Sequence, residues 1–227
     1  MSNNPTLDLA NQFARYTHKN IFLTGKAGTG KTTFLRNLKS SVHKRMAVVA
    51  PTGVAAINAG GVTIHSFFQL PFTPHIPDSI ISTGGNHRFT KERINLIKSL
   101  DMLVIDEISM VRADLLDAID EVLRKYRNRS KPFGGVQLLM IGDLHQLAPV
   151  VKEEDWRLLK DYYDTAYFFG SRALELTNPV RIELTHIYRQ TDNVFIDLLN
   201  NIRENQITPS VLEALNQRYV PNFKPSE

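Results

Sequence analysis

A glycine-rich stretch near the start of the chain has the residue types and spacing of a phosphate-binding loop. It matches G-x-x-x-x-G-K-[ST] and lies between a predicted strand, 21–24, and a predicted helix, 32–40. Glycines let backbone N–H groups face a phosphate, and the helix N-terminus adds its dipole. Lys31 would reach the β- and γ-phosphates, and the Thr32 hydroxyl would hold Mg²⁺. The alternative is a plain Gly-rich turn. The flanking pattern favours a nucleotide site formed by Gly25, Lys26, Ala27, Gly28, Thr29, Gly30, Lys31, Thr32 and Thr33.

Two carboxylates follow an apolar run. Residues 103–105 read as a strand that is covered on both faces, and Asp106 and Glu107 come directly after it. We expect this strand to lie beside strand 21–24, so that Asp106 faces Mg²⁺ and Glu107 orients or deprotonates an attacking water. Many strands end in acidic turns, so this pair indicates a catalytic site only because a phosphate loop is also present. A water-activating Glu argues against nucleotide kinases, which transfer phosphate to a substrate.

Two further segments offer polar side chains to the same nucleotide. Gln146 follows a predicted buried strand, 136–141, and its amide could sense the γ-phosphate. Arg189 could supply positive charge to the transition state, and Tyr188 could stack on the base. Without the phosphate loop, both segments would be interpreted as surface turns.

The segment from Ala50 to Phe68 combines small, hydroxyl and aromatic residues. Small residues let a nucleic-acid strand lie close to the backbone, hydroxyl and imidazole groups donate to phosphates, and an aromatic ring stacks on a base. Because Phe67 and Phe68 are adjacent, we expect at least one of them in the core. Phosphate contacts carry no 2′-OH readout, so they do not separate DNA from RNA. The candidate contacts are Thr52, Gly53, Thr63, His65, Ser66 and Phe68.

Composition and charge narrow the class of protein. The chain has 227 residues, 42% of them hydrophobic and 22% charged, which is typical of a globular protein rather than a disordered or fibrous one. It contains no Cys, so disulfides and thiolate metal sites are excluded, and it has no run of eighteen apolar residues that would predict a membrane span. The N-terminus does not resemble a signal peptide, which favours the cytosol. Residues 1–100 carry a net charge of +9 and residues 101–227 carry −5, so the first part suits a phosphate-bearing partner.

The remaining patterns predict the elements that position these groups. Apolar runs at 21–24, 46–50, 103–105, 136–141 and 181–184 alternate with helical patterns at 114–126, 194–203 and 209–218. This alternation predicts an α/β fold with a mostly parallel sheet flanked by helices. Residues 69–90 contain Pro and Gly with little periodicity, so we interpret them as an inserted loop.

The ordered motifs GKAGTGKT, APTGVAA, TIHSFF, IDEISM, GDLHQLAPV and YRQ together resemble the Pif-one family of DNA helicases. These are superfamily-one enzymes related to RecD that move 5′ to 3′. The resemblance extends from about Asn20 to Arg203, and residues 114–137 resemble the family's signature between helicase motifs II and III. It implies a RecA-like P-loop NTPase domain that binds ATP and Mg²⁺. Lys31, Thr32 and Asp106 would contact Mg-ATP.

The resemblance also implies roles for the other motifs. Glu107 would be the catalytic base, Gln146 would contact the γ-phosphate and Arg189 would be an arginine finger. Single-stranded DNA would cross the region of Thr52, Gly61, Thr63, His65 and the loop from His145 to Pro149, with loop 69–90 as a wedge at a forked duplex. The chain departs from the family where a Gln reads adenine, because Asp8 stands there and the nearest Gln is Gln12.

The resemblance further implies the organisation and the partners. We interpret residues 1–217 as the first RecA-like motor domain and residues 218–227 as a linker toward a second one, which translocation requires. Family roles in DNA replication, DNA repair, telomere maintenance and G-quadruplex unwinding follow as expectations. They place the protein at a nucleoid in the cytoplasm, or in the nucleus or mitochondria of a eukaryote. Two alternatives stay open at this point, another P-loop ATPase without DNA translocation and a P-loop binding module without turnover.

Overall fold

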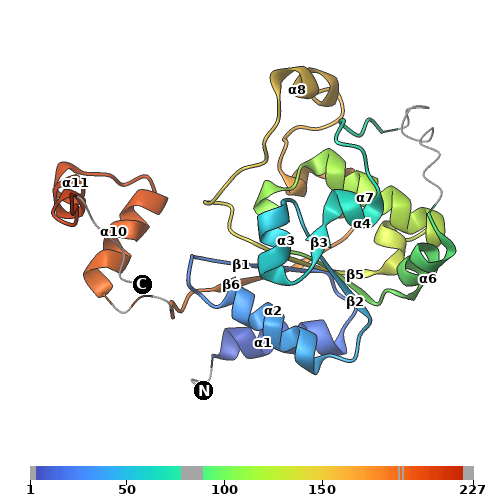
Figure 1. Ribbon diagram of the computed structural model, residues 1–227, viewed down its shortest axis with the longest axis horizontal. Helices are drawn as coiled ribbons and strands as arrows, with labels where there is room; N and C mark the ends of the chain where they lie inside the picture. The colour runs from blue at the N-terminus through green and yellow to red at the C-terminus, as the bar shows by residue number, and fades with distance from the viewer. Residues whose placement is uncertain (1–3, 78–88, 189, 191, 222–227) are drawn as a thin grey trace.

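The computed structural model describes residues 4–77, 89–188, 190 and 192–221 (Figure 1). Six parallel strands form one sheet in the order β3-β2-β4-β5-β1-β6, with helices on both faces. This is the α/β fold that the sequence predicted. The strands are β1 (Ile21–Gly25), β2 (Met46–Ala50), β3 (Val62–Thr63), β4 (Met102–Ile105), β5 (Gln137–Gly142) and β6 (Val180–Leu184).

Helices and short 3₁₀ turns connect the strands. Among the residues that the structure describes, no helix is both long enough and apolar enough to span a bilayer. The α-helices are α1 (Pro5–Tyr16), α2 (Lys31–Ser41), α3 (Gly53–Ala59), α4 (Ile64–Phe68), α6 (Lys91–Ser99), α7 (Ala113–Tyr126), α8 (Glu153–Leu159), α9 (Arg172–Glu175), α10 (Asn193–Arg203) and α11 (Pro209–Asn216). The 3₁₀ turns are η1 (Ile108–Met110), η2 (Pro132–Gly135) and η3 (Phe168–Gly170).

The sheet is covered on both faces because successive side chains of its central strands point to opposite sides. On β4, Leu103 and Ile105 join the core beneath α4, α6 and α7, whereas Met102 and Val104 join the core beneath α1 and α2. Figure 1 shows α1 and α2 on one side of the sheet and α4, α6 and α7 on the other. The all-apolar runs in the sequence are therefore strands buried on both faces.

The predicted strands and helices are present, but one neighbour relationship was wrong. We expected β4 next to β1, and the structure places β5 between them, with Leu139 paired to Ile21 on one side and to Val104 on the other. The reason is that β4 and β5 are equally apolar, so hydrophobicity does not encode their order. The carboxyl ends of all three strands still meet at one edge. The sequence patterns also missed β3 and the helices α1, α3, α4, α6, α8 and α9.

Helix α7 carries three aspartates spaced three residues apart, and each one fastens a different segment. Asp114 accepts a hydrogen bond from the backbone N–H of His75 (2.9 Å) and two from the Arg112 guanidinium. Asp117 accepts from the hydroxyls of Tyr163 (2.9 Å) and Ser171 and from the N–H groups of residues 172 and 173. Asp120 accepts from the N–H of Phe133 and from Arg124. The signature stretch 114–137 thus has a clear structural role.

Helices α10 and α11 lie beside the carboxyl edge of the sheet, apart from its two helical layers (Figure 1). Of their residues, only Leu198 is buried. Two polar contacts join α10 to the sheet edge, from Lys26 Nζ to the Asn200 side chain (2.8 Å) and from Arg203 to Asp143 (2.8 Å). These contacts bring α10 to the phosphate loop.

Candidate nucleotide site and nucleic-acid surface

Four of the predicted nucleotide-contacting segments meet at the carboxyl edge of the sheet. The phosphate loop follows β1, the carboxylate pair follows β4, the turn that carries Gln146 follows β5, and the segment that carries Tyr188 follows β6. A cleft of about 330 Å³ opens between them. It is lined by Ala27, Gly28, Gly30, Lys31, Thr32, Thr33, Glu107, Gln146 and Tyr188.

The phosphate loop has the backbone geometry that its glycines predict. Gly28 and Gly30 have φ values of 80° and 91°, in the left-handed region that favours glycine. Helix α2 begins directly after Gly30, and the Lys31 ammonium donates to the carbonyls of Gly25 (2.6 Å) and Lys26 (3.0 Å). Burial lowers the pKa of Lys31, and the carboxylates of Asp143, Glu107 and Asp106 oppose this shift. The loop therefore presents a cation within electrostatic range of three carboxylates.

Three residues of the predicted loop set, Gly25, Lys26 and Thr29, do not line the cleft, and the Lys26 ammonium contacts Asn200 of α10 instead. The buried Thr29 hydroxyl donates to the Lys26 carbonyl (2.8 Å), which closes the turn. A Cβ at Gly25 would lie 2.6 Å from the carbonyl oxygen of Leu184, so only glycine fits between β1 and β6 there. Gly25 and Thr29 therefore shape the loop, and the cleft is lined by the members from Ala27 to Thr33 other than Thr29.

The carboxylate pair combines burial with an unusual backbone. Burial raises the pKa of Asp106, and it raises the pKa of Glu107, where the neighbouring Asp106 carboxylate adds to the shift. Glu107 has φ 53° and ψ 45°, a left-handed conformation that costs a non-glycine residue about 1–2 kcal/mol. Such outliers concentrate at functional sites. Glu107 lines the cleft, whereas Asp106, which directly follows β4, does not.

Tyr188 closes the cleft at the side of β6. Its N–H donates to the Gly28 carbonyl (2.8 Å), and its hydroxyl accepts from the Asn4 side-chain amide (2.9 Å). Its ring passes beside Gly30, where an added Cβ would be 3.5 Å away. Arg189, the predicted arginine finger, lies outside the described residues.

Helix α1 contacts the wall of the cleft through its N-cap residue, Asn4. Asn4 caps α1 by accepting from the N–H groups of Thr6 and Leu7, and this fixes the amide that contacts Tyr188. Asp8 and Gln12, at or near the place of the adenine-reading Gln of the family, are both exposed on α1. Neither lines the cleft.

An ion pair that sequence reasoning missed holds the turn that carries Gln146. Asp143 is 1% exposed, and its carboxylate accepts from Arg203 Nη2 (2.8 Å) and Nε (3.3 Å), from the N–H of His145 (3.1 Å) and from Gln146 Nε2 (3.3 Å). Burial alone would raise the pKa of Asp143, but the Arg203 guanidinium and the His145 N–H outweigh it and hold that pKa below its ordinary value. The partners are 60 residues apart in the chain, so no local pattern could have paired them.

We predict that Arg203→Ala slows ATP hydrolysis by about tenfold or more, because loss of the pair frees the turn and displaces Gln146. Arg203→Lys should restore only part of the rate, since an ammonium does not reproduce the two-pronged contact. The measurement is the hydrolysis rate together with nucleotide affinity, which should change little. Arg181→Ala, which removes an exposed arginine that pairs with Glu183 on β6, is the matched control. Equal rates for Arg203→Ala and Arg181→Ala would contradict the assignment.

The predicted nucleic-acid contacts lie at the same edge of the sheet, at the end of β3 and after β2 and β5. Thr52 and Thr63 are the N-caps of α3 and α4, where their hydroxyls accept from the N–H groups of Ala55 and Ser66 (both 3.2 Å). Ser66 and His145 are exposed, and Pro149 is half-buried. The hydroxyl hydrogens of both threonines stay available to a ligand.

The aromatic prediction needs correction. Phe68 is 1% exposed and Phe67 is also buried, and the two rings pack edge to face in the core. Neither ring offers a face to a base. Successive residues on a helix lie about 100° apart, so both fit on one apolar stripe of α4.

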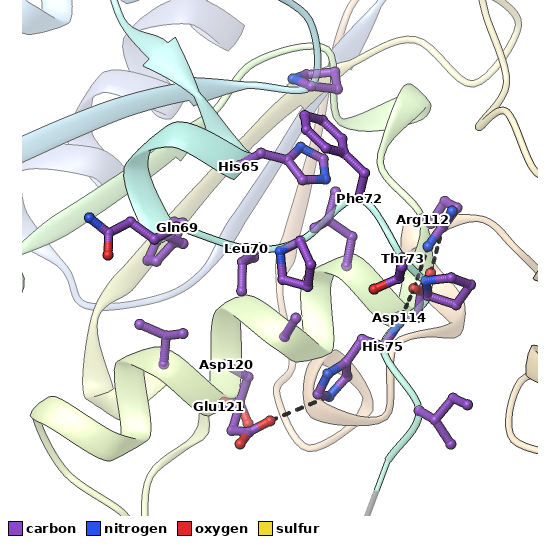
Figure 2. Close-up of a pocket in the computed structure, with 18 of the residues that line it drawn as sticks. His65, Gln69, Leu70, Phe72, Thr73, His75, Arg112, Asp114, Asp120 and Glu121 are labelled. Carbon is purple, nitrogen blue, oxygen red and sulfur yellow. Dashed lines mark hydrogen bonds and ion pairs between the residues drawn. The ribbon is translucent and has the colours of Figure 1, made fainter. Parts of the chain in front are cut away.

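A second, larger cavity of about 900 Å³ lies between residues 65–76 and α7 (Figure 2). Pro51, Thr52, His65, Phe72 and Val150 contribute to its wall, together with apolar and charged side chains of α7. Burial and then the Arg112 guanidinium lower the pKa of His65, and the Asp114 carboxylate opposes this shift. Residues 69–77 and 89–90 of the predicted inserted loop contain no helix or strand, and the rest of that loop lies outside the described residues.

Comparisons with known proteins match this arrangement. Residues 7–212 match the PIF1-like helicase family. The ATP-dependent DNA helicase RRM3 of Saccharomyces cerevisiae is 34% identical over 201 residues, which cover 86% of this chain and 27% of that protein. A crystal structure of Pif1 helicase from Bacteroides in complex with ADP-AlF3 and single-stranded DNA is 42% identical with a TM-score of 0.91, covering 100% of this chain and 52% of that one.

A structure of two coordinating Pif1 helicases at forked double-stranded DNA is 43% identical with a TM-score of 0.90, and the match covers 97% of this chain and 53% of that one. The chain therefore spans about half the length of the solved relatives and about a quarter of the curated one.

Proposed function

Because this chain belongs to the PIF1-like helicase family, we propose that it is the first motor domain of an ATP-dependent DNA helicase. It binds and hydrolyses Mg-ATP and contacts single-stranded DNA, and it unwinds DNA 5′ to 3′ only together with a second RecA-like domain. The observation that carries the proposal is the cleft in which Lys31, Glu107 and Gln146 come together from the ends of three strands.

The cleft suits a nucleotide triphosphate. Lys31 and the N–H groups of the phosphate loop bind the phosphates, and Glu107 takes a proton from the attacking water. Gln146 senses the γ-phosphate, Tyr188 stacks on the base, and Arg189 supplies charge to the transition state.

The residues present also suit Mg²⁺. This ion is usually held by one or two protein groups plus phosphates, and Thr32 and Asp106 supply two. Within the described residues, no group of three or more His, Cys, Asp or Glu gathers that could hold a metal alone. The ion, when bound, neutralises charge on the transferring phosphoryl group.

Single-stranded DNA fits the surface formed by Thr52, Gly53, Thr63, Ser66 and His65, with His145 and Pro149 beside it. The Bacteroides relative was crystallised with single-stranded DNA, and residues 1–100 carry a net charge of +9, which favours a polyanion. Forked or otherwise structured DNA is the substrate of the whole protein in this proposal, with residues 69–90 at the fork.

Two glycines of this surface differ in what an added side chain would meet: the fold requires glycine at position 61, whereas position 53 has free space. A Cβ at Gly61 would lie 2.3 Å from the Val48 carbonyl oxygen, whereas a Cβ at Gly53 would meet nothing within 4 Å. We expect Gly61→Ala to destabilise the fold by about 1–3 kcal/mol. Gly53→Ala should leave thermal stability unchanged and weaken oligo-dT binding, because the methyl group meets an approaching strand. Binding by Gly53→Ala that equals the wild type would remove Gly53 from the DNA surface.

The organisation of the whole protein extends the proposal. Residues 1–217 form the motor domain and residues 218–227, of which 222–227 lie outside the described residues, lead toward the second RecA-like domain. We place the protein with its DNA, in the cytoplasm at a nucleoid or in the nucleus or mitochondria of a eukaryote. Replication, repair, telomere maintenance and G-quadruplex unwinding are the family roles that this activity would serve.

The direct test is ATP hydrolysis by a protein in which this chain is followed by the second RecA-like domain. Single-stranded DNA should stimulate hydrolysis, and the stimulation should fall as salt rises, because phosphate contacts release counterions. Hydrolysis that oligonucleotides do not stimulate would favour a P-loop ATPase without DNA translocation. A protein that hydrolyses no ATP, and whose DNA binding does not change when nucleotide is added, would favour a P-loop binding module without turnover.

A further inference from the structure

Phe72 is an aromatic residue at the surface whose position needs an explanation. It is 83% exposed, although its ring is the kind of apolar group that folding normally buries. One face of the ring lies against the imidazole of His65, with centroids 4.5 Å apart and an angle of 22° between the planes. Figure 2 shows the two rings face to face at the rim of the larger cavity. The other face of Phe72 is open.

The segment that carries Phe72 is fixed on both sides. Before it, the N–H of Leu70 donates to the His65 carbonyl (3.1 Å). After it, the N–H of His75 donates to the buried Asp114 carboxylate (2.9 Å), which the Arg112 guanidinium holds with two hydrogen bonds. The ring of His75 points toward Glu121 on α7, with Nε2 3.5 Å from the carboxylate (Figure 2). Phe72 is therefore presented by anchored backbone, which lowers the entropy lost on binding.

Phe72 also lies among the residues of the proposed DNA surface. It contributes to the same cavity wall as Thr52, His65 and Val150, whereas the two aromatic residues that the sequence suggested for stacking are buried. A flat ring that lines the same cavity as the Thr52 hydroxyl, in the half of the chain that carries the positive charge, matches a base attached to a phosphate backbone.

We propose that the open face of Phe72 stacks on a nucleobase of single-stranded DNA, with the His65 ring as its backing. The inference rests on the proposed function, because it extends the same DNA surface by one residue. Stacking on Phe72 is independent of base identity, since every base has a π-face. His65 then acts on DNA chiefly through the ring that it supports.

The test is the binding of this chain to oligo-dT that contains one 2-aminopurine, read by anisotropy and by quenching of the 2-aminopurine. Phe72→Ala should weaken binding by roughly 5- to 150-fold and abolish the quenching at one position of the probe. The slope of affinity against salt should stay unchanged, because no phosphate contact is lost. Phe72→Trp should restore both readouts, and Phe72→Leu, which keeps an apolar side chain, should restore neither.

Tyr16→Ala is the matched control, since Tyr16 is another exposed aromatic and ends α1 where the chain leads to the opposite edge of the sheet. It should leave binding unchanged. Equal affinity and quenching for Phe72→Ala and the wild type would overturn the inference and leave the proposed function standing, as would full restoration by Phe72→Leu. A wild-type chain that binds no oligonucleotide would overturn the inference together with the DNA-binding part of the proposed function.

Discussion

Replacing Glu107 by Gln is expected to slow ATP hydrolysis by about 100- to 10,000-fold, the usual contribution of a general base. Gln has the same shape, so it fills the same place at the tip of β4, but its amide does not take a proton from water. ATP binding should change little, because the phosphate loop is untouched. The measurement is the DNA-stimulated hydrolysis rate of the protein that carries both RecA-like domains, with nucleotide affinity measured separately.

Glu153→Gln is the control for this prediction. Glu153 is an exposed carboxylate on α8 whose salt bridge is to Arg157, also exposed, so its replacement should leave the rate unchanged. Unchanged hydrolysis in Glu107→Gln would remove Glu107 as the base. It would also leave its left-handed backbone and its place in the cleft without a catalytic explanation.

Replacing Asp117 by Ala is expected to produce the largest loss of stability. The carboxylate of Asp117 accepts four hydrogen bonds, and the change leaves the hydroxyls of Tyr163 and Ser171 and two backbone N–H groups without their acceptor. Burial and the Asp117 carboxylate raise the pKa of Tyr163, which keeps its hydroxyl a donor. We expect a loss of about 3 kcal/mol or more, which corresponds to a fall in Tm of roughly 6–12 °C for a chain of this size.

Chemical denaturation and thermal unfolding measure this effect. Asp117→Asn should be less damaging, because its amide oxygen still accepts some of the hydrogen bonds. Asp161→Ala, at an exposed turn after α8, is the control and should change stability by no more than about 0.5 kcal/mol. An Asp117→Ala protein as stable as the control would show that α7 does not depend on this network.

The parts of the site that local sequence specifies were predictable. The phosphate loop is contiguous, so its glycines, Lys31 and Thr32 appear as one pattern, and the structure gives Gly28 and Gly30 the left-handed φ values that the pattern requires. The acidic pair and Gln146 follow apolar runs, and the parallel sheet brings the ends of those runs together. The meeting of Glu107 and Gln146 in one cleft follows from this parallel arrangement.

The parts that depend on contacts between distant segments were not predictable. The pairing of Arg203 with Asp143 and of Asn4 with Tyr188 joins segments whose local sequence carries no sign of the other. The order of β4 and β5 was not encoded by strand composition, because both strands are apolar and buried throughout. Phe72 lies in a segment recognised only as a loop, and its exposure and its contact with His65 are three-dimensional facts. The choice of Phe68 failed because two adjacent aromatic residues on a short helix can both be buried.

We expect this domain to hold nucleotide and DNA in one coupled unit. The most direct measurement is the fluorescence anisotropy of labelled oligo-dT with this chain, at two salt concentrations, with and without a non-hydrolysable ATP analogue and Mg²⁺. We predict binding that weakens as salt rises and that changes when the analogue is added. Binding that ignores the analogue, or absence of binding in every condition, would contradict the claim.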